Sequence, residues 1–213
     1  MSQATGRFIT FEGGEGVGKS TNIQFCADYI ASQGIEVVIT REPGGTEIAE
    51  IIREELLKKQ HEERMTSMTE LLLVFAARAQ HIEQKIKPAL EAGKWVLCDR
   101  FTDSTVAYQG AARGLGVEVI EQLKSLVQQG LEPDATFLLD APIEIGMGRA
   151  KNRGPADRFE VEQLDFFEQV RQGFLQLAYN NPQRITLIDA SQELTSVQDQ
   201  LGEALASLMA ENS

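Results

Sequence analysis

A glycine-rich stretch near the start of the chain carries the clearest chemistry. Its sequence Gly-Gly-Glu-Gly-Val-Gly-Lys-Ser, at positions 13–20, follows a β-like run at 7–11 and precedes a helical pattern at 21–32. Glycines let successive backbone N–H groups turn inward, and the positive end of the following helix points to the same place. This order indicates a polyphosphate site rather than an ordinary glycine-rich turn. We expect Lys19 to reach the outer phosphates and the Ser20 hydroxyl to suit a Mg²⁺ bound to the nucleotide.

Charged residues also stand at positions where a second anion would bind. The apolar run at 95–98 ends in Asp99 and Arg100. Because the carboxyl ends of parallel strands line the ligand crevice, Asp99 is a candidate for holding Mg²⁺ or its water, and Arg100 for gripping a phosphate. The alternative is a structural ion pair. Arg78 lies on the apolar face of a helical pattern at 67–91, where it needs an anion, unless it extends to the surface or pairs with a nearby acid.

Four basic residues fall within ten positions, at 149, 151, 153 and 158, and Gly154-Pro155 interrupts them. Glycine and proline predict a hinged surface segment, and we expect a mobile lid at about 149–160 that closes over phosphates. A lid excludes water and delivers an arginine to the transferring phosphoryl group. A solvated run of charge is the alternative.

A sheet is needed to position these residues. β-like runs at 7–11, 36–40, 95–98, 135–139 and 185–188 alternate with helical patterns at 21–32, 46–58, 67–91, 117–128, 143–152 and 161–179, and a last amphipathic pattern follows. Alternation of this kind predicts βαβ crossovers and a three-layer α/β fold, with helices on both faces of a parallel five-stranded sheet. The stretch 101–116 is too polar for a core and too aromatic for a simple linker, so we expect it to cover a ligand.

Apolar spacing predicts the buried face of each helix. The predicted buried residues are Ile48, Ile51, Ile52 and Leu56 in the second helix, Leu164, Phe167, Val170, Phe174 and Leu177 in the sixth, and Val197, Leu201, Leu205 and Leu208 in the last.

Composition narrows the classes of function. The chain of 213 residues fits one domain, 1–213, and its net charge of −12 argues against binding polymeric nucleic acid. It has neither an apolar run of membrane-spanning length nor the pattern of a signal peptide, so we expect a cytoplasmic protein without a membrane partner. Cys26 and Cys98 are expected to be reduced and structural, although a pair formed by proximity is left open.

Five motifs behind Glu15 resemble bacterial thymidylate kinase, in the same order and over nearly the whole chain. They are Arg41-Glu42-Pro43-Gly44-Gly45, Phe75-Ala76-Ala77-Arg78, Asp99-Arg100-Phe101, Ala107-Tyr108-Gln109-Gly110 and the basic segment 149–158. The resemblance implies a P-loop nucleoside monophosphate kinase fold and a homodimer. It also implies transfer of the terminal phosphoryl group of ATP to dTMP with Mg²⁺, which gives dTDP for dTTP biosynthesis.

The same resemblance assigns site residues by their positions in these motifs. The ATP site comprises Gly13, Gly14, Glu15, Gly16, Val17, Gly18, Lys19, Ser20, Thr21 and Arg149. The dTMP site comprises Glu15, Pro43, Arg53, Phe75, Arg78, Arg100, Ser104, Thr105, Tyr108 and Gln109. The metal would lie at Ser20 and Asp99.

Particular roles follow from the resemblance. Glu15 would contact the sugar 3′-hydroxyl, Arg53 and Arg100 the acceptor phosphate, and Arg78 and Gln109 the base. Phe75 would stack on thymine, although some relatives carry the aromatic one position earlier, where this chain has Val74. The catalytic set would be Lys19, Arg100, Glu15 and an arginine of the lid. The resemblance assigns this arginine to the lid because the loop has no basic residue before Lys19. Arg153 is the first choice, with Arg149 and Arg158 as alternatives.

Two other functions compete with this interpretation. One is a kinase for another nucleoside monophosphate or a small metabolite. The other is a nucleotide-dependent switch that binds a protein partner, but the D-x-x-G and N/T-K-x-D motifs of such GTPases do not follow Asp99 or Asp140.

Overall fold

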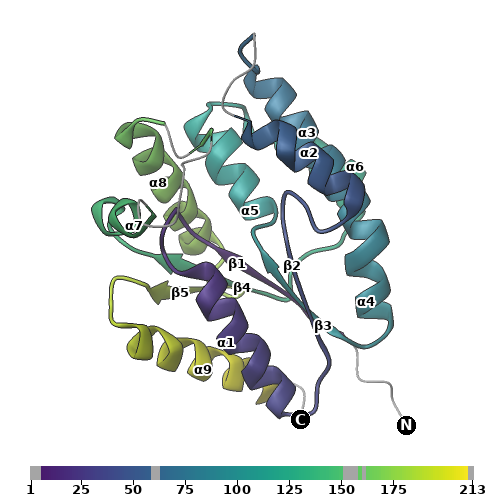
Figure 1. Ribbon diagram of the computed structural model, residues 1–213, viewed down its shortest axis with the longest axis vertical. Helices are drawn as coiled ribbons and strands as arrows, with labels where there is room; N and C mark the ends of the chain where they lie inside the picture. The colour runs from purple at the N-terminus through teal and green to yellow at the C-terminus, as the bar shows by residue number, and fades with distance from the viewer. Residues whose placement is uncertain (1–5, 59–62, 151–157, 160–161, 211–213) are drawn as a thin grey trace.

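Five parallel strands form the centre of the protein. The computed structural model describes residues 6–58, 63–150, 158–159 and 162–210. The strands β1 (Phe8–Glu12), β2 (Val37–Arg41), β3 (Trp95–Asp99), β4 (Ala135–Asp140) and β5 (Ile185–Asp189) form one sheet in the order β2-β3-β1-β4-β5 (Figure 1). The predicted parallel five-stranded sheet is thus confirmed.

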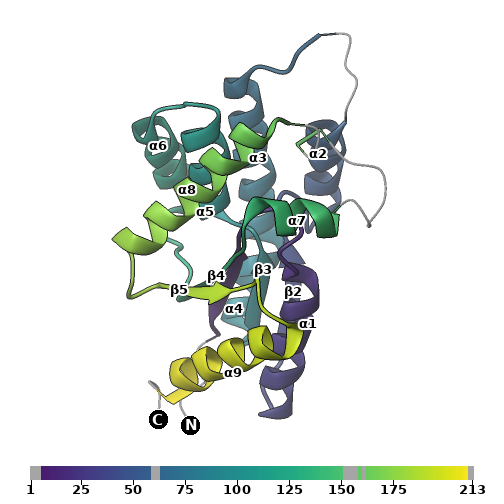
Figure 2. The ribbon, with the colours of Figure 1, turned by 90° about the vertical axis from the view of Figure 1, so that its left-hand side faces the viewer.

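Helices cover both faces of this sheet (Figure 2). The helices α1 (Lys19–Ser32) and α9 (Leu194–Ala210) pack together on one face, where Ile9 and Phe11 of β1 meet them in the largest apolar cluster. Phe8 of β1 points to the opposite face and contacts a second cluster. Strands that are buried on both sides carry continuous apolar runs, as the three inner strands β1, β3 and β4 do, whereas the edge strands β2 and β5 have exposed residues. The predicted three-layer arrangement is therefore confirmed.

The remaining helices lie on the opposite face or beside it. They are α2 (Glu47–Leu57), α3 (Ser67–His81), α4 (Lys87–Glu91), α5 (Thr102–Thr105), α6 (Val117–Gln128), α7 (Ile143–Ala150) and α8 (Leu164–Asn180). The Thr46 hydroxyl accepts a hydrogen bond from the Ala49 N–H and so caps α2. None of the helices within the described ranges is long and apolar enough to cross a membrane.

Two stretches that form π-helical turns differ from the simple helical pattern. The predicted helix 67–91 is interrupted by η1 (Ile82–Ile86), directly before Pro88. A proline ring clashes with the carbonyl four residues back, and a wider turn there relieves this clash. The polar stretch after Arg100 also winds into a π-helical segment, η2 (Val106–Ala112).

Some predicted core positions are wrong. Ile48 and Ile51 are 53% and 59% exposed, because α2 packs on α3 rather than on the sheet and buries Ala49 and Leu56 instead. Leu164 is 62% exposed because it lies at the first position of α8, ahead of the turns that cover the sheet. The other predicted core residues of α8 and α9 are buried or partly buried, and Cys26 and Cys98 are free and buried.

The glycine-rich loop touches α7 through backbone atoms. A Cβ at Gly16 would lie 1.8 Å from the Gly146 carbonyl oxygen, and one at Gly146 would lie 2.4 Å from the Glu15 carbonyl oxygen. Only glycine allows two backbones to approach this closely. The helix α7, which leads into the basic segment, is consequently held against the loop.

Candidate functional site

The phosphate loop joins the end of β1 to α1, as predicted. Lys19 is buried, and its Nζ donates hydrogen bonds to the carbonyl oxygens of Gly13 and Gly14, at 3.3 and 3.0 Å. Burial is the largest cause of a lowered pKa for Lys19, and nearby Arg100 lowers it further. A polyphosphate in the loop would supply the negative charge that this ammonium group otherwise obtains only from carbonyl dipoles and nearby acids.

Arg100 links the loop to the neighbouring strand. Its backbone has a φ of 68°, in the left-handed region that is uncommon outside glycine. Its Nη1 donates to the Gly13 carbonyl oxygen at 2.8 Å and to the Ser104 hydroxyl at 3.1 Å, and its Nη2 lies 2.6 Å from Glu15 Oε1. The guanidinium is therefore fixed between the phosphate loop and the side chains that follow β3.

A buried acid, Glu12, holds this unusual backbone in place. Its Oε1 accepts the Phe101 N–H at 2.7 Å, and its Oε2 lies 2.5 Å from the Ser104 hydroxyl, which in turn contacts Arg100. Burial, and to a smaller extent nearby Asp103, raise the pKa of Glu12, while the bonds from Ser104 and Phe101 and the charge of Arg100 lower it, and the net pKa is about 7. The carboxyl group beneath the loop thus titrates near neutral pH.

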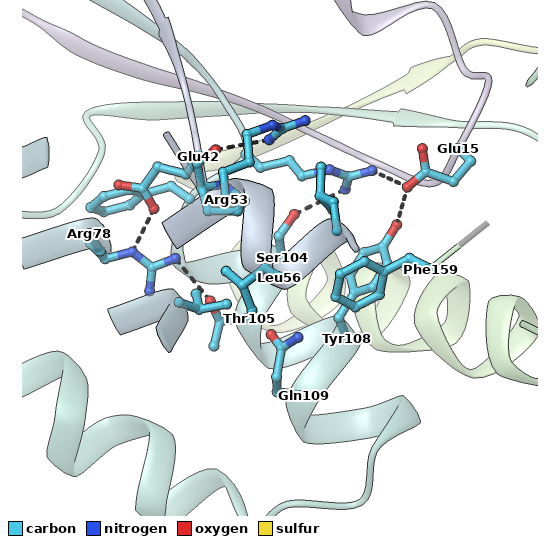
Figure 3. A pocket seen from close by; sticks show the side chains of 15 residues that line it. Glu15, Glu42, Arg53, Leu56, Arg78, Ser104, Thr105, Tyr108, Gln109 and Phe159 are labelled. Carbon is cyan, nitrogen blue, oxygen red and sulfur yellow. Dashed lines mark hydrogen bonds and ion pairs between the residues drawn. The ribbon is translucent and has the colours of Figure 1, made fainter. Parts of the chain in front are cut away.

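A cavity of about 130 Å³ lies next to Arg100 (Figure 3). Of the ten residues predicted for the dTMP site, all but Phe75 line it, namely Glu15, Pro43, Arg53, Arg78, Arg100, Ser104, Thr105, Tyr108 and Gln109. The other lining residues are Glu42, Leu56, Leu57, Val74, Phe101 and Phe159.

Glu15 lies at the mouth of the cavity, where the phosphate loop meets η2. Its Oε1 accepts the Tyr108 hydroxyl at 2.8 Å in addition to Arg100. Burial raises the pKa of Tyr108 well above its usual value, so the phenol stays a donor. The Arg53 Nη1 donates to the Pro43 carbonyl oxygen at 2.8 Å on the facing wall. Two guanidinium groups and one carboxylate thus line the space beside the loop.

Arg78 is buried on the cavity wall in a chain of polar contacts. Its Nε donates to Glu42 Oε2 at 2.7 Å, and its Nη2 donates to the Thr105 hydroxyl at 2.9 Å. The second oxygen of Glu42 lies 2.9 Å from His81 Nδ1. Arg78 Nη1 is buried and has no hydrogen-bond partner among the described residues. Arg78 is thus paired with an acid of the protein, which is the alternative given for it above, and one of its donors is left over.

Phe75 lies behind Arg78 rather than on the cavity wall. Its ring centroid is 4.8 Å from the Arg78 guanidinium carbon, and Phe101 lies at 4.9 Å from the same atom. Val74, one position earlier, lines the cavity. The stacking role predicted for Phe75 is not tested by this arrangement, which gives the ring a packing contact with Arg78.

Gln109 lines the cavity and lies beside an acid of α3. Its Nε2 donates to Glu70 Oε1 at 2.8 Å, and both side chains are almost completely buried. Arg158, from the end of the basic segment, lies 2.7 Å from Glu70 Oε2 through its Nη2. The end of the predicted lid is therefore linked through Glu70 to Gln109, the residue predicted to contact the base.

The residues predicted for a metal share a separate hollow on the other side of the loop. Ser20 and Asp99 both line it, and Asp99 Oδ1 is buried without a hydrogen-bond partner among the described residues. A hydroxyl and a carboxylate oxygen are suitable ligands for Mg²⁺, which usually keeps several waters and takes the rest of its ligands from phosphates. Within the described ranges, no three His, Cys, Asp or Glu side chains form a metal cluster of their own.

The predicted lid is only partly described. Arg149, in the last turn of α7, donates from Nη1 to the Ala190 carbonyl oxygen at 2.8 Å, and Arg158 donates from Nε to the Leu56 carbonyl oxygen at 2.7 Å. Arg153, the first choice for the catalytic arginine, lies outside the described residues, so its role stays a prediction.

Three acids and one aromatic residue of the site were not predicted from the sequence. They are Glu12, Glu42, Glu70 and Phe159, which contact Ser104, Arg78, Gln109 and Tyr108 respectively. Glu12 follows an apolar strand directly, and Glu70 stands one turn into an apolar helical face. An acid in such a position is costly to bury unless it has partners, and this signal was available in the sequence.

Comparisons with known proteins agree over nearly the whole chain. A family model described as thymidylate kinase matches residues 11–201. The chain is 55% identical over 205 residues to the thymidylate kinase of Ectopseudomonas mendocina, covering 96% of this chain and 97% of that protein. It is 53% identical over 206 residues to that of Alcanivorax borkumensis, covering 97% and 99%. The crystal structure of thymidylate kinase from Ehrlichia chaffeensis matches with a TM-score of 0.76 at 37% identity, covering 94% and 99%.

The buried Glu12 leads to a prediction about pH and stability. Its pKa rises from 4.5 to about 7 on folding, so the folded protein binds more protons than the unfolded chain in this interval. The Glu12 contribution therefore lowers the free energy of unfolding as the pH rises through the interval, by about 3 kcal/mol in all. Glu12→Gln should remove most of this loss, as measured by urea unfolding at about pH 4.5 and about pH 8.

Glu91→Gln, at an exposed acid, is the matched control and should leave the difference between the two pH values unchanged. If Glu12→Gln and the wild type lose the same stability between the two pH values, Glu12 is not the titrating group.

Proposed function

Since the chain belongs to the thymidylate kinase family and phosphorylates dTMP to dTDP with ATP, we propose that its 130 Å³ cavity holds dTMP beside the ATP-binding loop. The observation that carries this proposal is the position of Arg100, whose guanidinium touches both the phosphate loop and the cavity-lining Ser104. Phosphoryl transfer needs the donor and the acceptor in line and close together. The loop and the cavity meet at the Arg100 guanidinium, so a donor bound in one and an acceptor bound in the other would lie close together.

The donor side is built from the loop and α1. Backbone N–H groups of the loop and the amino end of α1 would bind the phosphates of ATP, with Lys19 turning from the Gly13 and Gly14 carbonyls to the outer phosphates. Mg²⁺ would lie at Ser20 and Asp99, and the assignment is supported by Asp99 Oδ1, which is buried and has no hydrogen-bond partner in the described ranges. When bound, the metal would neutralise charge that builds up on the transferring phosphoryl group.

The acceptor side offers complementary groups for a keto pyrimidine. Arg78 Nη1 is a donor that has no hydrogen-bond partner in the part of the chain that the structure describes, which suits a base carbonyl oxygen. The Gln109 amide group bonds Glu70 through its Nε2, which leaves its carbonyl oxygen for a ring N–H. Thymine has such a carbonyl and N–H side by side, whereas cytosine has an amino group and an unprotonated nitrogen in these places.

The remaining cavity residues suit the sugar and phosphate of the acceptor. Arg53 and Arg100 would bind the dTMP phosphate, and Glu15, between them and Tyr108, would accept the sugar 3′-hydroxyl. The Arg100–Glu15 pair orients both groups before any substrate arrives. Preorganised charges cost little to rearrange during the reaction.

We also assign the remaining stabilisation of the transferring group to a lid arginine, with Arg153 as first choice. The described end of the segment supports this assignment, because Phe159 forms part of the cavity wall and Arg158 is bonded to the end of α2. We place the enzyme in the cytoplasm, as expected for an enzyme of nucleotide synthesis.

A homodimer is the proposed assembly. Exposed apolar side chains lie on the adjacent helices α2 and α3, with Ile48 and Ile51 on the first and Met68 and Leu72 on the second (Figure 1). Apolar surface of this kind on neighbouring helices supports an interface with a second copy of the chain.

The base contact is tested with a panel of acceptors. For the wild type, kcat/KM should be higher for dTMP than for dCMP, dGMP and AMP. The panel also includes dUMP, which is a close analogue of dTMP. Gln109→Ala should lower kcat/KM for dTMP by about 10- to 100-fold and change that for dCMP little, because a hydrogen bond specific to thymine is lost. Comparable turnover of all acceptors, or a preference for a purine, would contradict the proposed acceptor site.

Arg153→Ala tests the lid arginine. We expect kcat to fall by about 10³-fold with little change in dTMP affinity, because its contact forms in the transition state. Lys151→Ala, which removes another charge of the same segment, is the control. Equal losses of kcat and affinity in Arg153→Ala, or no loss at all, would show that another arginine acts.

The dimer is tested by light scattering after size-exclusion chromatography. Ile51→Glu combined with Leu72→Glu should convert the dimer into a monomer, because two charges would be buried in the interface. Leu164→Glu, at an equally exposed leucine of α8, should leave the dimer intact. A wild-type monomer, or a dimer that survives the double substitution, would contradict this assembly.

A further inference from the structure

We propose that Glu70 is a positioning residue that sets the acceptor-base selectivity of the enzyme by fixing the orientation of the Gln109 amide. The inference deepens the proposed function and rests on its assignment of Gln109 to the base. Glu70 itself does not line the cavity. Its effect on the substrate would pass entirely through the neighbouring side chain.

Glu70 is placed to bind the NH₂ group of the Gln109 amide. It lies in the first turn of α3, is 1% exposed, and receives the Gln109 Nε2 at 2.8 Å. Gln109 is 3% exposed and lines the cavity from η2. Glu70 and Gln109 are 39 positions apart in the chain, and the hydrogen bond between their side chains is buried.

The chemistry of a carboxylate allows only one orientation of the amide. An ionised carboxylate accepts hydrogen bonds and donates none, so it bonds the amide NH₂ and repels the amide oxygen. In the reverse orientation two oxygens would face each other in a buried site, where an unpaired polar group is costly. The Gln109 carbonyl oxygen must therefore be the atom offered to a base.

Two arginines support the negative charge of Glu70. Arg158 Nη2 lies 2.7 Å from its Oε2, and Arg113 Nε donates to its Oε1 at 3.4 Å. Arg113 is itself paired with Glu162, at 2.7 Å, and Arg158 is tied to the Leu56 carbonyl oxygen. A buried carboxylate needs such partners to stay charged. The orientation of Gln109 thus depends on a charged group that the end of the basic segment helps to hold.

This orientation discriminates between pyrimidines. A carbonyl oxygen accepts the ring N3–H of thymine or uracil, but it faces an unprotonated N3 in cytosine, which also accepts. Leaving buried acceptors unpaired is what allows a site to reject a close analogue strongly. Glu70 would thereby impose a preference for keto pyrimidines without touching them.

Glu70→Gln tests the inference directly. A neutral amide at position 70 both donates and accepts, so it can bond the Gln109 amide in either orientation, and a turned amide would suit cytosine. We expect the ratio of kcat/KM for dTMP to that for dCMP to fall about tenfold, while Glu70→Asp, which keeps the charge, retains most of the wild-type ratio. Glu83→Gln, at an exposed acid paired with Lys87, is the matched control and should leave the ratio unchanged.

A double-substitution cycle separates positioning from simple destabilisation. If Glu70 acts through Gln109, Glu70→Gln should have no further effect on the ratio in a Gln109→Ala background. A purely structural role would lower kcat/KM for both acceptors equally and leave the ratio at its wild-type value, which would overturn the inference. If Gln109→Ala itself leaves the ratio unchanged, the proposed base contact fails. If Gln109→Ala lowers it and Glu70→Gln does not, only the role of Glu70 fails.

A measurement on the unsubstituted protein keeps the test independent of how well Glu70→Gln folds. In isotope-labelled protein, the Gln109 side-chain NH₂ should be protected from exchange before and after dTMP is added, and its carbonyl carbon resonance should move on binding. An NH₂ that loses protection or shifts strongly with dTMP, while the carbonyl carbon does not move, would show the opposite orientation and overturn the inference.

Discussion

The contact of Arg100 with the phosphate loop is the interaction on which the rest of the site depends. One guanidinium bonds the Gly13 carbonyl oxygen and Glu15 of the loop and the Ser104 hydroxyl after β3. It can do so because β1 and β3 are adjacent in the sheet and both end at the same edge. The proposed donor and acceptor sites are therefore positioned by one sheet.

Holding Arg100 in this place has structural consequences beneath it. Its left-handed backbone is bracketed by two hydrogen bonds, from the Arg100 N–H to the Phe11 carbonyl oxygen and from the Phe101 N–H to Glu12. Such a backbone persists where its surroundings determine it, and it commonly occurs at functional sites. The buried Glu12 carboxyl, with its raised pKa, is part of the cost of this arrangement.

The buried charges around the cavity are likewise held in place by other parts of the protein. Arg78 is paired with Glu42, and Glu70 with Arg158, before any ligand is bound. In the proposed site, each pair leaves one neighbouring polar atom for the base, Arg78 Nη1 in one case and the Gln109 carbonyl oxygen in the other. Because buried partners fix these atoms, we propose that they discriminate between ligands of similar shape.

Much of the molecule could be predicted from local sequence. The phosphate loop depends on neighbouring residues, and each strand carries an apolar run of its own, so both appear as continuous patterns. The motifs around Arg78, Arg100 and Gln109 likewise led to most of the residues that line the cavity. Ile48 and Ile51 show the limit, because periodicity finds the apolar face of a helix but not what that face packs against.

The pairing of buried charges was decided only by the tertiary structure. Glu42 and Arg78 are 36 positions apart, and Glu70 and Gln109 are 39 apart, on elements that meet only when the chain is folded. An acid such as Glu70 looks like an ordinary polar residue of a helix until a partner covers it. Local sequence thus determines which groups can bind phosphate, whereas packing between distant elements determines which donor or acceptor each group presents.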